Sequence, residues 1–159
     1  MKSGFLFILG FAAIMALGAK GQGGLVQLRS ATEQFQRFEV AQAAGYNALW
    51  GPNQCNSSFG GAGYQYVNVG LVDTTVDLLH PEALIYVPGP DGTLQLAAVE
   101  YIVPVAAWNT AHSNKWPQVM DQQFGLNSSL GVYILHVWVW KENPSGVFED
   151  WNPSVACSI

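Results

Sequence analysis

The densest run of hydrophobic positions is residues 132–140, which are almost entirely β-branched or aromatic. Neither face of this run carries the polar alternation of a strand with one side in water, so it predicts a central strand covered on both sides. Because side chains alternate along a strand, one face is expected to carry Val132, Ile134, His136, Trp138 and Trp140. The run therefore places a histidine in a row of apolar and aromatic side chains.

Residues 25–49 place apolar side chains at the spacing of one helical face, with glutamine, glutamate and arginine between them. The pattern predicts one amphipathic helix that ends before Gly51 and Pro52. Gly45 inside this pattern costs about 1 kcal/mol relative to alanine and marks a bend or an earlier stop. We expect the apolar face of the helix to pack on the sheet.

A loop rich in Gly, Asn and Ser, residues 51–63, is interpreted as a tight connector that leads into a short strand over residues 64–69. Two β-rich runs, residues 83–87 and 93–103, then flank a segment of Pro and Gly. This punctuation predicts a β-hairpin. Alternation along its second strand sets Glu100 among apolar neighbours on one face.

The stretch from residue 105 to residue 130 is interpreted as a long irregular connection that holds Trp108, His112 and Trp116. A helix of one or two turns is expected over residues 117–124. Long connections inside a compact domain are usually functional or cover an opening. We therefore expect this stretch to lie over one opening of the sheet.

The order of these elements indicates an α+β fold, with one long N-terminal helix packed on an antiparallel sheet of about four strands. On element order alone, the nearest comparison is a cystatin-like arrangement of a helix on a curved sheet. A small β-barrel with the helix as a plug is the alternative. Residues 22–159 are expected to form a single globular domain.

The first 21 residues have the features of a signal peptide. Lys2 precedes an apolar run, residues 4–17, which is too short to span a bilayer and is followed by small residues. Removal of residues 1–21 leaves no membrane span, and the chain is expected to be secreted or periplasmic.

Composition limits the partners of this domain. With 159 residues, 50% hydrophobic and 11% charged, the chain is expected to bury a sizeable core. Its net charge is −5, and its six Lys and Arg residues are spread singly. The absence of a basic stripe argues against nucleic-acid binding and against adhesion to an anionic membrane.

Two cysteines are present, Cys55 and Cys157. In an oxidising compartment we expect them to be joined, with a buried free pair as the alternative. A bridge that closes a loop of about 100 residues stabilises a fold by roughly 4 to 5 kcal/mol in the chain-entropy description. In a eukaryotic secretory pathway, Asn56 and Asn127 would be acceptors for glycosylation.

Several phrases resemble a family of exported, mostly bacterial proteins of uncharacterised function. They are PEALIY at 81–86, VEY at 99–101, LHVWVW at 135–140, NPSGVF at 143–148 and DWNP at 150–153, with Cys157. The resemblance covers most of the chain after Gly60 and implies export, but it implies no particular activity. In the family's pattern a histidine precedes Tyr-Val-Asn, where this chain has Gln65, and a metal site that used this position would be weakened here.

Common catalytic motifs such as HExxH, the nucleophile elbow and the Walker loop do not occur in the sequence. The titratable side chains that stand out are Glu82, Glu100, His112 and His136. A carboxylate in an apolar strand needs a charged or hydrogen-bonding partner. For Glu100 that partner is expected to be His136, or an arginine of the helix, Arg29 or Arg37.

Glu100 and His136 share a face in only one of the two register parities of an antiparallel pair. In that register the ion pair is expected to raise the pKa of His136 and to lower that of Glu100. With His112 or Glu82 as a third ligand, the pair could hold a divalent metal ion. Otherwise His136 is a satisfied core histidine.

Three classes of function follow. The favoured one is a module that binds a small apolar or aromatic molecule or a divalent metal. Its ligand-binding residues would be Glu100, His136, Trp138 and Tyr101, and its metal ligands Glu100, His136 and His112. The second is an enzyme that uses Glu100 and His136 as an acid and base pair on a small substrate. The third is a structural or envelope-interaction protein, marked by a filled interior and an exposed aromatic patch.

Overall fold

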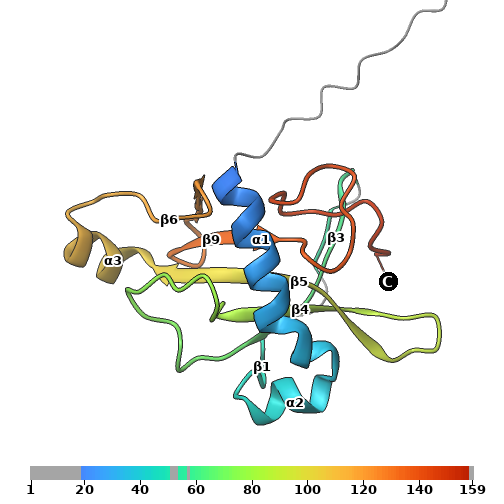
Figure 1. Ribbon diagram of the computed structural model, residues 1–159. Coiled ribbons are helices and arrows are strands. Elements are labelled where there is room, and N and C mark those ends of the chain that lie inside the picture. Colours follow the sequence, from blue (N-terminus) through green and yellow to red (C-terminus); the bar gives the residue numbers. More distant parts are fainter. Residues whose placement is uncertain (1–18, 51–53, 57, 158–159) are drawn as a thin grey trace, which may run out of the picture.

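The computed structural model describes residues 19–50, 54–56 and 58–157. It shows an α+β fold in which one main helix, α1 (Ala19–Thr32), lies across one face of an antiparallel sheet (Figure 1). The expected signal peptide falls almost entirely outside the described residues. Within those residues, no helix is both long enough and apolar enough to cross a membrane.

Four adjacent strands form the centre of the sheet, as the sequence predicts. In sheet order they are β3 (Gly60–Val67), β4 (Ala83–Pro88), β5 (Leu94–Pro104) and β9 (Val132–Val137). Three shorter strands extend it, namely β1 (Ala48–Leu49), β2 (Gln54–Asn56) and β8 (Gly125–Asn127). In the described part of the chain, β1 and β8 stand at opposite ends of the strand order and do not pair, so the alternative of a closed barrel is wrong.

The single helix expected over residues 25–49 is also wrong. α1 ends at Thr32 and is followed by a 3₁₀ turn, η1 (Glu33–Gln36), and a short helix, α2 (Phe38–Ala43). Gly45, which has a φ of 101°, then turns the chain toward β1. The stop that Gly45 suggests in the sequence is therefore real, but a first break precedes it.

This first break turns two phenylalanines onto the sheet. Phe35 is buried, and its carbonyl oxygen accepts a 2.6 Å hydrogen bond from the Tyr86 hydroxyl. This bond satisfies a carbonyl group that, in a continuing helix, would accept a hydrogen bond from the next turn. After Arg37, which is extended, Phe38 packs edge-on against Tyr66 and Tyr86, with ring centroids 4.6 and 5.0 Å apart. A contact with the sheet thus overrides the local periodicity.

The two faces of the sheet differ in character. β5 turns Val99 and Tyr101 toward α1, where they join a large buried apolar cluster with Leu28 of the helix. It turns Ala98 and Glu100 to the opposite face, part of which is covered by the C-terminal segment, residues 149–157. The candidate chemistry therefore lies on the face that α1 does not cover.

The expected irregular cover over residues 105–130 is largely regular. It begins with a helix that the sequence pattern did not predict, α3 (Val105–His112). The helix expected over residues 117–124 is wrong, because β6 (Gln118–Val119) and β7 (Gln122–Gln123) pair as a hairpin there. The two residues between them have φ values of 53° and 60°, which a helix cannot contain. That this segment lies over one opening of the sheet stays a prediction.

β9 ends at Val137, three residues before the expected end of the strand. The backbone N–H of Trp138 donates to the carbonyl oxygen of Val147 at 2.8 Å, while those of Trp140 and Lys141 both donate to the carbonyl oxygen of Ala97. The chain therefore departs from the regular ladder but stays beside β5. Trp140 turns to the α1 face, where its Nε1–H donates to the Thr32 hydroxyl at 3.0 Å. The expectation that Trp140 lies on the histidine face is therefore wrong.

The glycine-rich run at residues 60–63, expected to be part of a connector, is the first half of β3. Gly61 and Asn152 exchange two backbone hydrogen bonds, of 3.2 and 3.0 Å, which hold the C-terminal segment on the strand. A Cβ atom at Gly61 would come within 2.7 Å of the Val155 side chain. The glycine is therefore needed for this close approach.

Cys55 and Cys157 form the disulfide that the sequence predicts. It joins β2 to the C-terminal segment across a sequence separation of 102 residues. In the chain-entropy description, a bridge of this span contributes about 4 to 5 kcal/mol. The bridge and the contact at Gly61 together fasten the C-terminal segment to one end of the sheet.

Replacing Gly60 by alanine is expected to cost more than backbone strain alone. Gly60 has a φ of 98°, and an added Cβ atom would collide with the backbone oxygen of Asn152. Gly92 is the matched control, since it has a φ of 80° and nothing within 4 Å of its Cβ position. We expect Gly92→Ala to lower the free energy of unfolding by about 1 to 2 kcal/mol, and Gly60→Ala to lower it by at least about 1 kcal/mol more. Equal losses in urea unfolding would contradict the seating of the C-terminal segment on β3.

Candidate functional site

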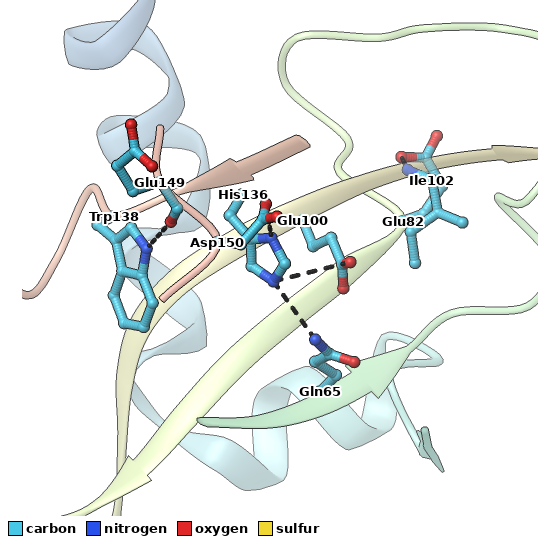
Figure 2. Close-up of polar contacts among 8 residues, drawn as sticks. All are labelled: Gln65, Glu82, Glu100, Ile102, His136, Trp138, Glu149 and Asp150. Carbon is cyan, nitrogen blue, oxygen red and sulfur yellow. Dashed lines mark hydrogen bonds and ion pairs between the residues drawn. The ribbon is translucent and has the colours of Figure 1, made fainter. Parts of the chain in front are cut away.

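Glu100 on β5 and His136 on β9 are direct cross-strand neighbours on the face opposite α1 (Figure 2). Both residues are buried, with 2% and 3% of their surface exposed, and Glu100 Oε1 lies 3.8 Å from His136 Nε2. The strands thus adopt the register in which the two side chains share a face. The helix arginines do not take this role, since Arg29 stacks over Trp140 and Arg37, which precedes α2, forms an exposed ion pair with Glu39.

The register follows from the apolar residues that flank the pair. Ile102 lies opposite Ile134 on the site face, and Tyr101 lies opposite Leu135 on the α1 face. A slip of one residue in the pairing would move all the β9 side chains, including His136, to the opposite face of the sheet. Packing on both faces of the sheet therefore fixes the position of the charged pair.

A third charged group, which the sequence reasoning missed, reaches the pair from the C-terminal segment. Asp150 Oδ1 lies 3.2 Å from His136 Nδ1, and the Asp150 side chain is 60% exposed. On the other side of the ring, Gln65 Nε2 of β3 lies 3.4 Å from His136 Nε2. These contacts fit a neutral imidazole that donates its Nδ1–H to Asp150 and accepts a hydrogen bond from the Gln65 amide.

Burial decides the ionisation of Glu100. It raises the pKa of Glu100, although the neighbouring His136 acts to lower it. The lower pKa expected from an ion pair alone is therefore wrong. Burial also acts to lower the pKa of His136, but the Glu100 and Asp150 carboxylates outweigh it and the pKa is raised. The hydrogen bond with His136 lowers the pKa of Asp150.

Glu100 Oε2 has no hydrogen-bond partner among the described residues. The other oxygen, Oε1, has only the 3.8 Å contact with His136, which is too long for a hydrogen bond. An unsatisfied buried polar group costs about 1 to 3 kcal/mol, and more when it is charged. Glu100 is therefore buried without the interactions that would satisfy it.

A pocket of about 90 Å³ adjoins the pair. Besides Gln65, Glu100, His136 and Asp150, its wall includes two tryptophans, Trp50 and Trp151, and the small residue Ala62. The stretch expected to cover the sheet contributes Asn127 and Leu130. None of the described residues in this wall is a lysine or an arginine.

Two of the expected ligand-binding residues lie outside this wall. Trp138 is buried in an apolar cluster on the same face, and its Nε1–H donates to the carbonyl oxygen of Glu149 at 2.6 Å (Figure 2). Tyr101 points to the α1 face, where its hydroxyl donates to the carbonyl oxygen of Leu78 at 2.7 Å. Both side chains therefore make contacts that hold the fold together.

The metal site expected from Glu100, His136 and His112 is not formed in the described part of the chain. His112 lies at the end of α3, where its Nε2 is 2.9 Å from the carbonyl oxygen of Thr74. Within the described residues, no group of three or more His, Cys, Asp or Glu residues is arranged to hold a metal ion. The pair thus has neither the expected third ligand nor a substitute in metal-binding geometry.

Glu82, the alternative third ligand, is a second buried carboxyl group with a separate role. Its Oε2 accepts a 2.9 Å hydrogen bond from the backbone N–H of Ile102 (Figure 2). Burial raises the pKa of Glu82 to about 8, against the opposing effect of this hydrogen bond. Glu82 therefore tethers the start of β4 to β5 as a largely neutral acid at neutral pH.

Comparison with protein-family models, with curated proteins and with solved structures found no match for this chain. The fold class therefore rests on the structure, and the cystatin-like comparison stays a prediction. The resemblance to an exported bacterial family likewise stays a prediction. What the site does has to be argued from its geometry.

Replacing Asp150 by asparagine tests how His136 is held. The change removes a charge next to the imidazole, so the pKa of His136 is expected to fall. Because the fold raises the pKa of His136, the stabilisation is present at low pH and is lost as the pH rises through the folded value. Asp150→Asn should therefore be less stable than the native chain at about pH 5 and approach it at about pH 9.

Glu149→Gln is the control for this variant. It also removes a carboxylate from the segment, but Glu149 contacts Trp138 through its backbone carbonyl oxygen, which the change leaves in place. NMR titration of the His136 imidazole and urea unfolding at the two pH values measure both effects. An unchanged pKa of His136 in Asp150→Asn would show that the two side chains do not interact in solution.

Proposed function

We propose that this chain is an exported module that binds a small polar molecule in the pocket beside Glu100 and His136. The observation that carries the proposal is Glu100 Oε2, a buried oxygen next to open space that has no hydrogen-bond partner among the residues that the structure describes. Carboxyl groups buried for structure alone have hydrogen-bond partners, as Glu82 has. A bound molecule that donates a hydrogen bond to Oε2 supplies the interaction that the fold leaves out.

The size of the pocket limits the ligand. A volume of about 90 Å³ accommodates only a few water molecules. Sites for drug-sized ligands have volumes of roughly 300 to 1,000 Å³. The part of the ligand that enters the pocket is therefore expected to have only a few non-hydrogen atoms.

Export is supported by two features of the chain. The Cys55–Cys157 disulfide is of a kind that persists in oxidising compartments. Residues 1–21 have the charged start, apolar run and small residues of a signal peptide. We therefore place the protein in a secreted or periplasmic location.

Filling the pocket separates a binding role from a structural one. Ala62 is buried in β3 and lines the pocket, so Ala62→Leu is expected to occupy open space and to change stability by less than about 1 kcal/mol. The native chain is titrated with ethylammonium, acetamide and acetate while the NMR signals of the His136 imidazole are followed. At least one probe is expected to give saturable shifts, and Ala62→Leu should abolish them.

Ala107→Leu is the matched control, because Ala107 is exposed on α3 and its replacement should leave probe binding intact. A loss of about 1 to 3 kcal/mol in Ala62→Leu would instead indicate an overpacked, filled interior. Combined with an absence of probe binding, that loss would favour the third class, a structural or envelope-interaction protein.

A second candidate is an enzyme that uses Glu100 and His136 as an acid and base pair. The observation that favours it is the 3.2 Å contact between Asp150 and His136 Nδ1, which directs Nε2 toward Gln65 and Glu100. In this arrangement Nε2 can take a proton from a bound molecule. Glu100, whose pKa is raised, can donate a hydrogen bond to a carbonyl oxygen.

Acetone in D₂O tests this candidate. His136 would remove a methyl proton while Glu100 hydrogen-bonds the carbonyl oxygen, and return of a deuteron from solvent would label the methyl group. Mass spectrometry measures the label, and we expect uptake in Asp150→Asn to be at least about tenfold slower than in the native chain. Uptake no faster than in buffer would remove this candidate and leave the binding proposal standing.

A further inference from the structure

We infer that the ligand of this pocket is a small organic cation that carries a primary ammonium group on a short carbon chain. The inference rests on the proposed function and adds the charge and chemical class of the ligand. Three features of the site carry it, namely the charges in its wall, the unpartnered acceptor and the aromatic side chains.

The charged groups in the described wall are predominantly acidic. They are two carboxyl groups, Glu100 and Asp150, and one imidazole, His136, with no lysine or arginine. The pKa of Asp150 is lowered by its hydrogen bond with His136, so this carboxylate stays ionised. An anionic ligand would approach groups of its own sign, whereas an ammonium group meets opposite charge.

The unpartnered acceptor matches the donors of an ammonium group. Glu100 is 2% exposed, and its Oε2 has no partner within the described residues. An ammonium group has three N–H donors and no acceptor, and its hydrogen bond to a carboxylate is roughly twice as strong as a neutral one. The side-chain oxygen of Gln65 adds a further acceptor to the wall, whereas that of Asn127 already accepts a hydrogen bond from the backbone N–H of Leu130. One cation thus satisfies the buried oxygen and favours the ionised form of Glu100.

The remainder of the wall suits a cation with a short apolar chain. Trp50 and Trp151 both line the pocket, and the faces of indole rings attract positive charge. Leu130 and Ile134 provide apolar surface beside them. Because the volume is about 90 Å³, the carbon chain is limited to a few atoms.

Binding of a cation is also linked to proton release. His136 contacts Glu100 and Asp150, and Glu82 is a further carboxyl group that interacts with Glu100. A positive ligand disfavours a protonated imidazole and favours an ionised Glu100, so the complex holds fewer protons than the free protein. The affinity for an ammonium ligand is therefore expected to rise with pH while His136 loses its proton.

The test uses the full disulfide-bonded chain and three probes of similar size: ethylammonium, acetamide and acetate. NMR titration of the His136 imidazole and Trp151 indole signals gives a Kd for each probe. Ethylammonium is expected to bind most tightly. Glu100→Gln, which removes the charge at nearly constant shape, should raise its Kd about ten- to a hundredfold. Glu149→Gln should leave this Kd unchanged.

Asp150→Asn is the second variant in case Glu100→Gln alters the fold, because the Asp150 side chain is mostly exposed, and it should also raise the Kd of ethylammonium. Tighter binding of acetamide or acetate than of ethylammonium would overturn the inference and leave the proposed function standing. No binding of any probe to the native chain would remove both. An unchanged Kd for ethylammonium in both folded variants would overturn the inference, since the pocket would then not respond to charge.

Discussion

Two backbone hydrogen bonds between Gly61 and Asn152 form the contact on which the site depends. They seat the C-terminal segment on β3, so that Asp150 and Trp151, which directly precede Asn152, reach the pocket. The disulfide at Cys157 fastens the segment beyond this contact. The site formed by Glu100 on β5 and His136 on β9 is thus completed by a segment that belongs to neither strand.

The main apolar core and the candidate site lie on opposite faces of the sheet. Toward α1, aromatic and aliphatic side chains form one large buried cluster. Toward the C-terminal segment lie Gln65, Glu100 and His136, and burial of a carboxyl group without partners lowers stability. The cover on this face is held by a covalent bridge and by backbone hydrogen bonds, as well as by the small apolar cluster around Trp138. The fold can therefore carry an unsatisfied Glu100.

Alternation along the strands is sufficient to predict that Glu100 and His136 can share a face, but the choice of register depends on packing against both faces. Asp150 follows His136 by 14 residues, and no spacing rule connects the two. Residues 25–49 have helical periodicity, yet the helix is interrupted near Phe35, whose carbonyl oxygen accepts a hydrogen bond from the distant Tyr86. The features that the sequence could not supply are contacts between segments that lie far apart in the chain.

The residues of the main core are synthesised before the last residues of the candidate site. Every described member of the α1-facing cluster lies at or before Phe148, whereas Asp150, Trp151 and Cys157 follow it. A chain that stops at residue 149 therefore contains the whole of that cluster, yet it lacks the carboxylate on His136 and the bridge. Truncation there would also uncover the small apolar cluster around Trp138, because Val155 would be lost with the C-terminal segment. The candidate site therefore receives its last residues only after those of the main core have been made.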